Sequence, residues 1–117
     1  MTGYENLDVW KKSIGLVTDV YRLVKLLPKE ETYALSDQIR RSAVSVPSNI
    51  AEGSSRNSKK EFVQFLYISL GSLCELETQL LIAKNVGYIS NTENLKKDII
   101  SIKKMLNALI TSIKNTL

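Results

Sequence analysis

The chain has 117 residues, of which 44% are hydrophobic and 24% are charged, and its 16 Lys and Arg against 12 Asp and Glu give a formal net charge of +4. This composition is typical of one globular domain, and five glycines with two prolines are too few for the many turns of an all-β fold. Histidine is absent and cysteine occurs once, which excludes histidine-based triads, cysteine-rich zinc sites and an internal disulfide.

The first predicted helix spans residues 7–27. Apolar side chains recur there at intervals of three and four residues, which indicates one buried stripe along a helix. The predicted stripe consists of Trp10, Ile14, Val17, Tyr21 and Val24. Pro28 ends this helix, because the residue before a proline is disfavoured in the α region.

The second predicted helix spans residues 33–52, and Gly53 follows it as the expected C′ residue. Its apolar stripe is Leu35, Ile39, Ala43, Val46 and Ile50. Pro47 lies inside this range and removes the amide that would bond the carbonyl of residue 43. Either the helix ends near residue 45 and restarts, or it continues with a kink. We favour the continuous helix, because the apolar stripe keeps its phase across the proline.

Serines are frequent around this proline, and two roles are open to them. The hydroxyls of Ser42, Ser45 and Ser48 are expected to satisfy backbone groups freed at the kink. The polar side of the same helix is either a solvated or packed face, or a functional surface, since serine and asparagine are weak formers of a plain exposed helix. That polar side consists of Arg41, Ser45, Ser48, Asn49, Glu52 and Arg56.

The third predicted helix begins after Ser58, which forms a capping box with Glu61, and ends near residue 86 at Gly87. Its stripe is Phe62, Leu66, Ser69, Leu73, Leu76, Leu80 and Ala83. The fourth helix begins at a second capping box, Ser90 with Glu93, and continues to about residue 115. Its stripe is Leu95, Ile99, Ile102, Leu106, Leu109 and Ile113.

Four long helices with short links favour antiparallel neighbours. The sequence therefore predicts an all-α fold, an antiparallel up-down-up-down four-helix bundle, with residues 1–117 as a single domain. The N-terminus has no basic and apolar signal segment, and no run of about 18 apolar residues occurs, so we expect a cytoplasmic protein without membrane contact.

Three stretches of the chain carry a family resemblance: "YENLDVWKKS" from residue 4, "QIRRSAVSVPSNIAEGSSR" from residue 38 and "SKKEFVQFLYISLGSLCELETQLLIA" from residue 58. They closely resemble the bacterial four-helix bundle family encoded in intervening sequences of 23S rRNA genes. The resemblance implies a four-helix bundle without established enzymatic activity. More distantly, the chain resembles the accessory variability proteins of diversity-generating retroelements. Those proteins form five-membered rings with a basic surface, bind nucleic acid and contact a reverse transcriptase.

Candidate catalytic groups are few. Cys74 lies in the middle of a predicted helix and is expected to be a small packed residue. Glu75 and Glu77 are two residues apart and point to different faces, so they form no carboxylate pair. Glu52 and Glu75 are expected to pair with arginines or to bond backbone groups. We therefore predict no enzymatic activity, no metal site and no cofactor.

Basic residues concentrate between residues 40 and 60, a segment that contains five positively charged side chains and one acidic residue, Glu52. The predicted nucleic-acid-binding residues are Arg40, Arg41, Arg56, Lys59 and Lys60. The helix N-terminus after Ser58 adds positive potential to this cluster. Exposed lysines are also routine on helices, and the residues alone favour nucleic acid only weakly. The resemblance raises that expectation.

A second apolar stripe on the third helix predicts self-association, since one bundle core uses a limited apolar arc of each helix. The stripe is Val63, Tyr67, Leu70, Cys74 and Leu81, and Ile100 and Ile110 extend it on the fourth helix. The number five for the oligomer comes from the resemblance alone. The predicted function is a non-enzymatic oligomeric scaffold that binds RNA or DNA. The alternative is a protein–protein interaction adaptor that binds no nucleic acid.

Overall fold

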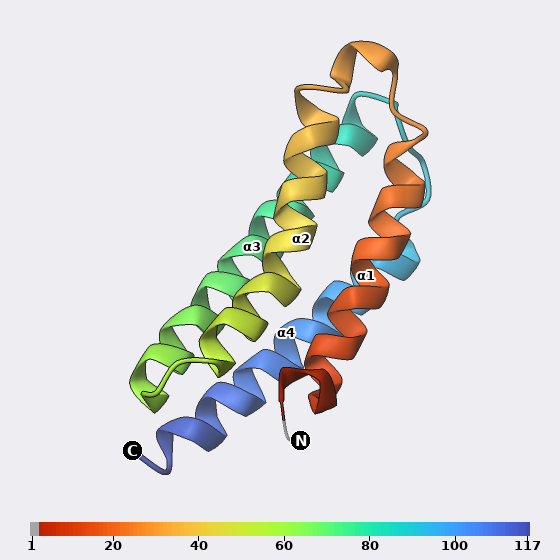
Figure 1. Cartoon of the computed structure of the whole chain (residues 1–117). Helices are drawn as coiled ribbons and strands as arrows, with labels where there is room; N and C mark the ends of the chain where they lie inside the picture. Colours follow the sequence, from red (N-terminus) through yellow and green to blue (C-terminus); the bar gives the residue numbers. More distant parts are fainter. Residues whose placement is uncertain (1–2) are drawn as a thin grey trace.

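The computed structural model describes residues 3–117, and that part of the chain forms four long helices, two short 3-10 helices and no strand (Figure 1). The long helices are α1 (Asp8–Val24), α2 (Leu35–Ser54), α3 (Lys59–Asn85) and α4 (Glu93–Lys114). The short ones are η1 (Tyr4–Asn6) and η2 (Lys29–Glu31). Each long helix packs against its neighbours in chain order, α4 returns to α1, and successive helices run in opposite directions. The predicted up-down-up-down bundle is confirmed.

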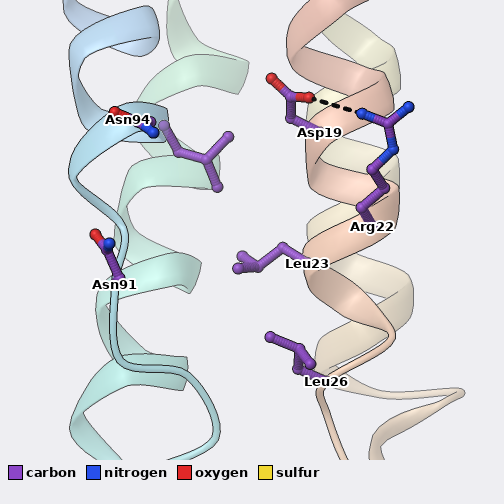
Figure 2. Close-up of a pocket in the computed structure, with 7 residues that line it drawn as sticks. Asp19, Arg22, Leu23, Leu26, Asn91 and Asn94 are labelled. Atoms are coloured by element: carbon purple, nitrogen blue, oxygen red, sulfur yellow. Dashed lines mark ion pairs between the residues drawn. The ribbon is translucent and has the colours of Figure 1, made fainter.

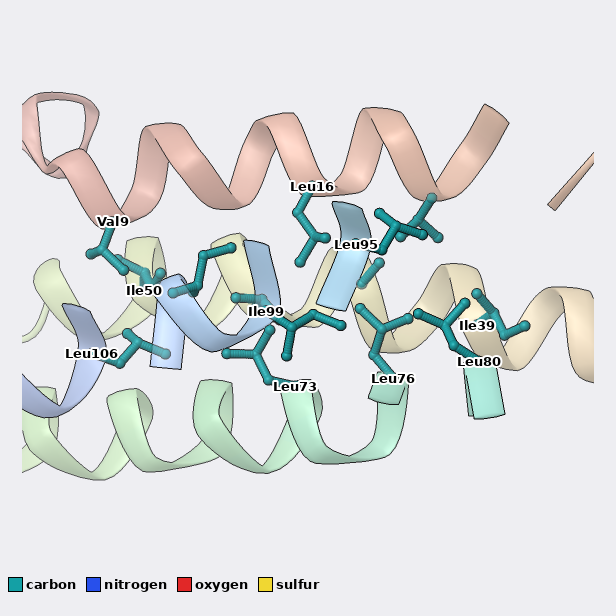
Figure 3. Close-up of a cluster of buried hydrophobic side chains, with 14 of the residues drawn as sticks. Val9, Leu16, Ile39, Ile50, Leu73, Leu76, Leu80, Leu95, Ile99 and Leu106 are labelled. Carbon is teal, nitrogen blue, oxygen red and sulfur yellow. The ribbon is translucent and has the colours of Figure 1, made fainter. Parts of the chain in front are cut away.

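The core is one layer of aliphatic side chains along the axis of the bundle (Figure 3). The predicted stripes of α2 and α3 are buried except at their first residues, Leu35 and Phe62, which are half-buried. In α4 the stripe is buried through Leu106, and Ile110 then replaces Leu109 and Ile113 in the core. Burial of each such side chain contributes roughly 1.5–3 kcal/mol.

The predicted stripe of α1 is wrong by about one residue. The side chains of α1 that the bundle buries are Val9, Ser13, Leu16, Val20 and Val24. Ile14 and Tyr21 keep 40% and 46% of their surface exposed. The prediction failed because the buried stripe contains a polar residue, Ser13, which hides its apolar periodicity in the sequence. Its hydroxyl donates to the carbonyl of Trp10 at 2.7 Å, so its burial leaves no unsatisfied group.

Pro47 does not break α2, because the helix continues to Ser54 and Ile50 is fully buried. The serine hydroxyls predicted to satisfy backbone groups near Pro47 do not do so: those of Ser42 and Ser48 make no hydrogen bond within residues 3–117, and Ser45 contacts α3. Ser45 Oγ bonds Ser72 Oγ on α3 at 2.7 Å, and Ser69 Oγ of α3 donates to the carbonyl of Val46 at 2.9 Å. Hydroxyls thus connect α2 to α3, and part of the polar face of α2 is packing rather than solvated surface.

Gly53 is not the C′ residue that the sequence predicts. It lies inside α2, buried, and only Gly87 among the described residues has a positive φ, at 88°. A Cβ atom on Gly53 would lie 2.6 Å from the Cβ of Phe65 and 3.0 Å from Cδ1 of Phe62. The glycine is required because α2 and α3 approach each other here more closely than a methyl group allows.

The predicted start and end of α3 are confirmed, whereas the predicted start of α4 is wrong. Ser58 Oγ accepts a hydrogen bond from the amide of Glu61 at 3.2 Å, and Gly87 closes the helix in the left-handed conformation. α4 has Thr92 as its N-cap residue instead of Ser90. Asn91 Oδ1 accepts from the amide of Glu93 at 3.1 Å and performs the capping there.

Glu31 joins the two loops at the η2 end of the bundle, a contact that no local sequence pattern predicts. Its carboxylate accepts from the amide of Leu35 at 3.2 Å and from the hydroxyl of Tyr88 at 2.9 Å. The hydrogen bond to this carboxylate, followed by desolvation, raises the pKa of Tyr88 above its ordinary value of 10.0. The link holds η2 against the segment between α3 and α4.

By length and composition alone, α3 is the one described helix that qualifies to cross a membrane. Only 33% of its most apolar window is buried in the bundle. A core helix meets the same criterion, and α3 supplies Leu66, Leu73 and Leu76 to the core. The outer side of α3 is therefore apolar as well, with Ile68, Leu81 and Ile82 exposed.

Gly53→Ala should destabilise the fold, although Gly→Ala normally stabilises a helix interior by about 0.5–1 kcal/mol. The added methyl would overpack against Phe65, at a cost of about 1–3 kcal/mol. Gly15→Ala is the matched control, because nothing lies within 4 Å of the position that its Cβ would take, and it should stabilise. Urea unfolding of both variants measures the two effects. Equal or greater stability of the Gly53 variant would contradict the close approach.

Tyr88→Phe should lower the free energy of unfolding at pH 7 by removing the bond to Glu31. Because the pKa of Tyr88 is raised, the bond stabilises fully below pH 10.0, and the stabilisation is lost as pH rises through the higher folded-state pKa. The difference between wild type and variant should therefore shrink at pH 11. Tyr33→Phe, at a side chain 94% exposed, should show no difference at either pH. A difference that persists unchanged at pH 11 would refute the assignment.

Candidate nucleic-acid interface

The five predicted basic residues do not form one cluster. Arg40 and Arg41 lie in the first half of α2, whereas Arg56 follows the end of α2 and Lys59 and Lys60 begin α3. At 1.5 Å per residue, about 21 Å of helix axis separates residue 40 from residue 54, where α2 ends, and Arg56 follows. The structure therefore divides the predicted interface into two parts.

Arg56 is held in place by two contacts. Its Nη2 lies 2.9 Å from Oε2 of Glu52, and its guanidinium carbon lies 5.0 Å from the centre of the Phe65 ring. The pair with Glu52 agrees with the expectation that this carboxylate binds an arginine. Since the two side chains are 43% and 50% exposed, the ion pair is worth under about 1 kcal/mol and is screened by salt. A planar guanidinium on an aromatic face is thus presented to solvent.

Lys59 and Lys60 occupy the first turn of α3, and Lys59 contacts the residues that follow α4. Lys59 Nζ donates to Thr116 Oγ1 at 3.0 Å, while Lys60 is exposed and makes no ion pair within residues 3–117. Ser58 caps the helix through one amide, and the remaining free amides of this turn carry positive potential.

Lys114 joins this cluster from the last turn of α4. Its Nζ donates to the hydroxyl of Tyr67 at 2.8 Å and lies 5.1 Å from the centre of that ring. Figure 1 shows the C-terminal end of α4 beside the link between α2 and α3. Lys114 escapes prediction from the sequence, because it lies far along the chain from Lys60 and only the up-down topology brings the two to one end. We call Arg56, Lys59, Lys60 and Lys114 the basic end.

Arg40 and Arg41 have contacts of their own on the other half of α2. Arg40 is half-buried and its Nη2 donates to the carbonyl of Thr32 at 3.2 Å. Arg41 Nε lies 2.8 Å from Oδ2 of Asp37, with 79% of the arginine side chain exposed. Both arginines line a surface hollow beside Tyr21 of α1. They therefore lie beside the boundary between α1 and α2 and not at the basic end.

The remaining candidate groups are structural or isolated. Glu77 Oε1 accepts from Lys103 Nζ at 2.7 Å, which joins α3 to α4 and raises the pKa of Lys103. Cys74 is exposed, so the expectation of a packed cysteine is wrong. Among the described residues, no three Cys, Asp or Glu side chains lie close enough to hold a metal ion.

A hollow of about 430 Å³ lies between α1 and the start of α4 (Figure 2). Asp19 and Arg22 line it and pair with each other at 3.5 Å, while Leu23 and Leu26 face the amides of Asn91 and Asn94 across it. Its two ionisable groups are both exposed and satisfy each other. The hollow contains no nucleophile positioned next to a base.

Known proteins resemble the chain both in sequence and in fold. The family of 23S rRNA-intervening sequence proteins matches residues 5–108 of the chain. Among solved structures, the chain is similar to a protein with unknown function from the S23 ribosomal protein family of Bacteroides thetaiotaomicron VPI-5482. The two share 30% sequence identity over 87% of this chain and 97% of that chain, with a TM-score of 0.79. No curated protein matches the chain.

Proposed function

The chain belongs to the family of 23S rRNA-intervening sequence proteins, and we propose that it is a non-enzymatic scaffold that self-associates and binds RNA or DNA through its basic end. The observation that carries the proposal is the convergence of four cations from three segments. Arg56 lies on the α2 side of α3, Lys114 on the α4 side, and Lys59 and Lys60 on the first turn between them.

The chemistry of the basic end suits a nucleic-acid backbone. Lysine ammonium groups and helix N-terminal amides contact phosphate oxygens as point charges and dipoles, without reading sequence. The rings of Phe65 and Tyr67 lie beside Arg56 and Lys114, respectively. These cations cover one face of each ring, and the outward plane of the Arg56 guanidinium is the surface on which an unpaired base can stack. We therefore expect the site to favour single strands or loops over duplex.

Self-association would repeat this small site and raise avidity without new contacts. It is supported by the exposed apolar residues Ile68, Leu81 and Ile82 on α3 and Ile100 on α4. Of the stripe predicted to mediate self-association, Val63 and Ile110 are buried in the core of the protomer instead. A pentamer is the state that the resemblance suggests.

The same exposed residues also favour the competing function, a protein-interaction adaptor that binds no nucleic acid. Large apolar surfaces on a globular protein mark interaction sites whatever their partner. The two functions differ in one measurable property, which is the salt dependence of nucleic-acid binding.

Labelled single-stranded RNA should bind the wild-type protein with strong salt dependence. If about four phosphates are engaged, log K should fall with log salt at a slope of roughly −3 to −4. Reversal of Arg56, Lys59 and Lys60 to Glu should weaken binding about tenfold or more at low salt and flatten the slope by about 3. Fluorescence anisotropy over a salt series measures both quantities, with unrelated RNA and DNA sequences showing similar losses.

Reversal of Lys84, Lys96 and Lys97 to Glu is the matched control. It changes the net charge by the same amount at exposed positions toward the other end of the bundle, where α3 ends and α4 begins. Affinity should fall only slightly. Equal losses from both triple variants would show attraction by net charge alone, and absence of binding by the wild type at low salt would leave the adaptor as the function.

A further inference from the structure

A groove runs along α1 and α2 as three adjoining hollows of about 450, 410 and 290 Å³. The first two share Tyr21 and Arg40, and the second and third share Val44. The residues Trp10, Ile14, Val17 and Tyr21, which the sequence predicted to be core, form its α1 wall. We call this surface the α1–α2 groove.

The α1–α2 groove has a basic half and an apolar half. Near η2, Lys25, Lys29, Arg40 and Arg41 line it, and Asp37 is the one acidic residue among the lining residues of that half. Farther along, the lining is almost entirely apolar: Tyr4, Trp10, Ile14, Val17, Val44 and Pro47. An occupant that fits both halves carries an acidic group and, beyond it along the axis, large apolar side chains.

The outer face of α3 has that combination. The exposed side chains along it, beyond Tyr67 at the basic end, are Ile68, Cys74, Glu75, Thr78, Leu81 and Ile82, and we call this surface the α3 ridge. Residues 62–83 contain no Lys or Arg. Glu77 pairs with Lys103, whereas Glu75 makes no ion pair within the described chain.

Gly71 supports close contact at the α3 ridge. It is an exposed residue in the middle of α3, where glycine is less favourable than alanine. No atom lies within 4 Å of the position that its Cβ would take, so packing within the protomer does not require a glycine. An approaching partner does account for it, as α3 itself accounts for Gly53.

We propose that the α1–α2 groove of one copy receives the α3 ridge of a second copy. The proposal rests on the self-association proposed above and names the surfaces that produce it. The spacing of the groups matches: six or seven residues separate Arg41 from Pro47 and Ser48, and the same number separates Glu75 from Leu81 and Ile82. At 1.5 Å per residue both intervals are about 9–10.5 Å. One register therefore pairs Glu75 with the basic half while Leu81 and Ile82 enter the apolar half.

The two surfaces lie on different parts of the bundle. α1 and α3 occupy opposite corners and their backbones do not approach each other, so the outer side of α3 faces away from the α1–α2 groove. Each copy can therefore use both surfaces at once. Such a contact is heterologous, and it produces a ring when the rotation between copies closes.

One ridge variant, Leu81→Glu, and one groove variant, Ile14→Glu, test the pairing. Their side chains are 55% and 40% exposed in the protomer, so both variants should fold, which circular dichroism checks. Light scattering coupled to gel filtration should show an oligomer for the wild type and the 13.2 kDa monomer for each variant alone. Leu26→Glu, at a side chain 66% exposed in the hollow between α1 and α4, is the matched control and should keep the wild-type mass.

The equimolar mixture of the two variants decides the geometry. One native groove and one native ridge remain, so the mixture should form a pair of copies and nothing larger. A groove variant that stays dimeric, or a mixture that stays monomeric, would overturn the head-to-tail pairing. If the wild type associates but both variants keep its mass, the surfaces are wrong while the proposed self-association stands. A monomeric wild type would overturn both, and the RNA titration would still decide nucleic-acid binding independently.

Discussion

The close approach of α2 and α3 is the constraint on which the rest of the structure depends. Gly53 leaves room for Phe65 at a distance that no side chain would tolerate, and two hydroxyl contacts, Ser45 with Ser72 and Ser69 with the carbonyl of Val46, join the helices farther along. Small residues permit this approach, and their hydroxyls bond each other or a backbone carbonyl, so the polar groups at the contact are satisfied. Contact between helices therefore explains Ser45 beside Pro47 and, on α3, Ser69 and Ser72.

This pairing determines which surfaces remain for function. α3 has more apolar residues than its core stripe needs, so a second apolar face is left outside the bundle. On α1, the face that contains Ser13 is buried in the core. Trp10, Ile14 and Tyr21 therefore lie outside the core, along the boundary with α2. The tight link after α2 also places Arg56 and the first lysines of α3 at one end, where the last turn of α4 adds Lys114. The surfaces proposed for assembly and for nucleic acid are thus consequences of one packing arrangement.

Local patterns predicted what depends on local physics. Periodicity identified four helices and the buried stripes of α2 and α3, because those stripes are strongly apolar, and the cap at Ser58 follows from side-chain chemistry within one turn. Three features escaped prediction because a tertiary contact decides them. Ser13 is buried although its side chain is polar, and Gly53 is required by a phenylalanine on another helix. Lys114 lies at the basic end because the fold brings the last turn of α4 there. The predicted basic residues fall into two separate groups for the same reason. Arg40 and Arg56 belong to one short segment of sequence, but the helix between them holds their side chains far apart.

Native-state hydrogen exchange tests most directly whether contact between α2 and α3 organises the molecule. Amides around residues 46–50 and 69–76 should exchange only through global unfolding, with an opening free energy equal to that measured by denaturant. Amides of α1 and α4 should exchange through smaller openings that leave α2 and α3 paired. Equal protection of the amides in all four helices would contradict this account. A lower opening free energy for the amides of α2 and α3 than for those of α1 and α4 would also contradict it.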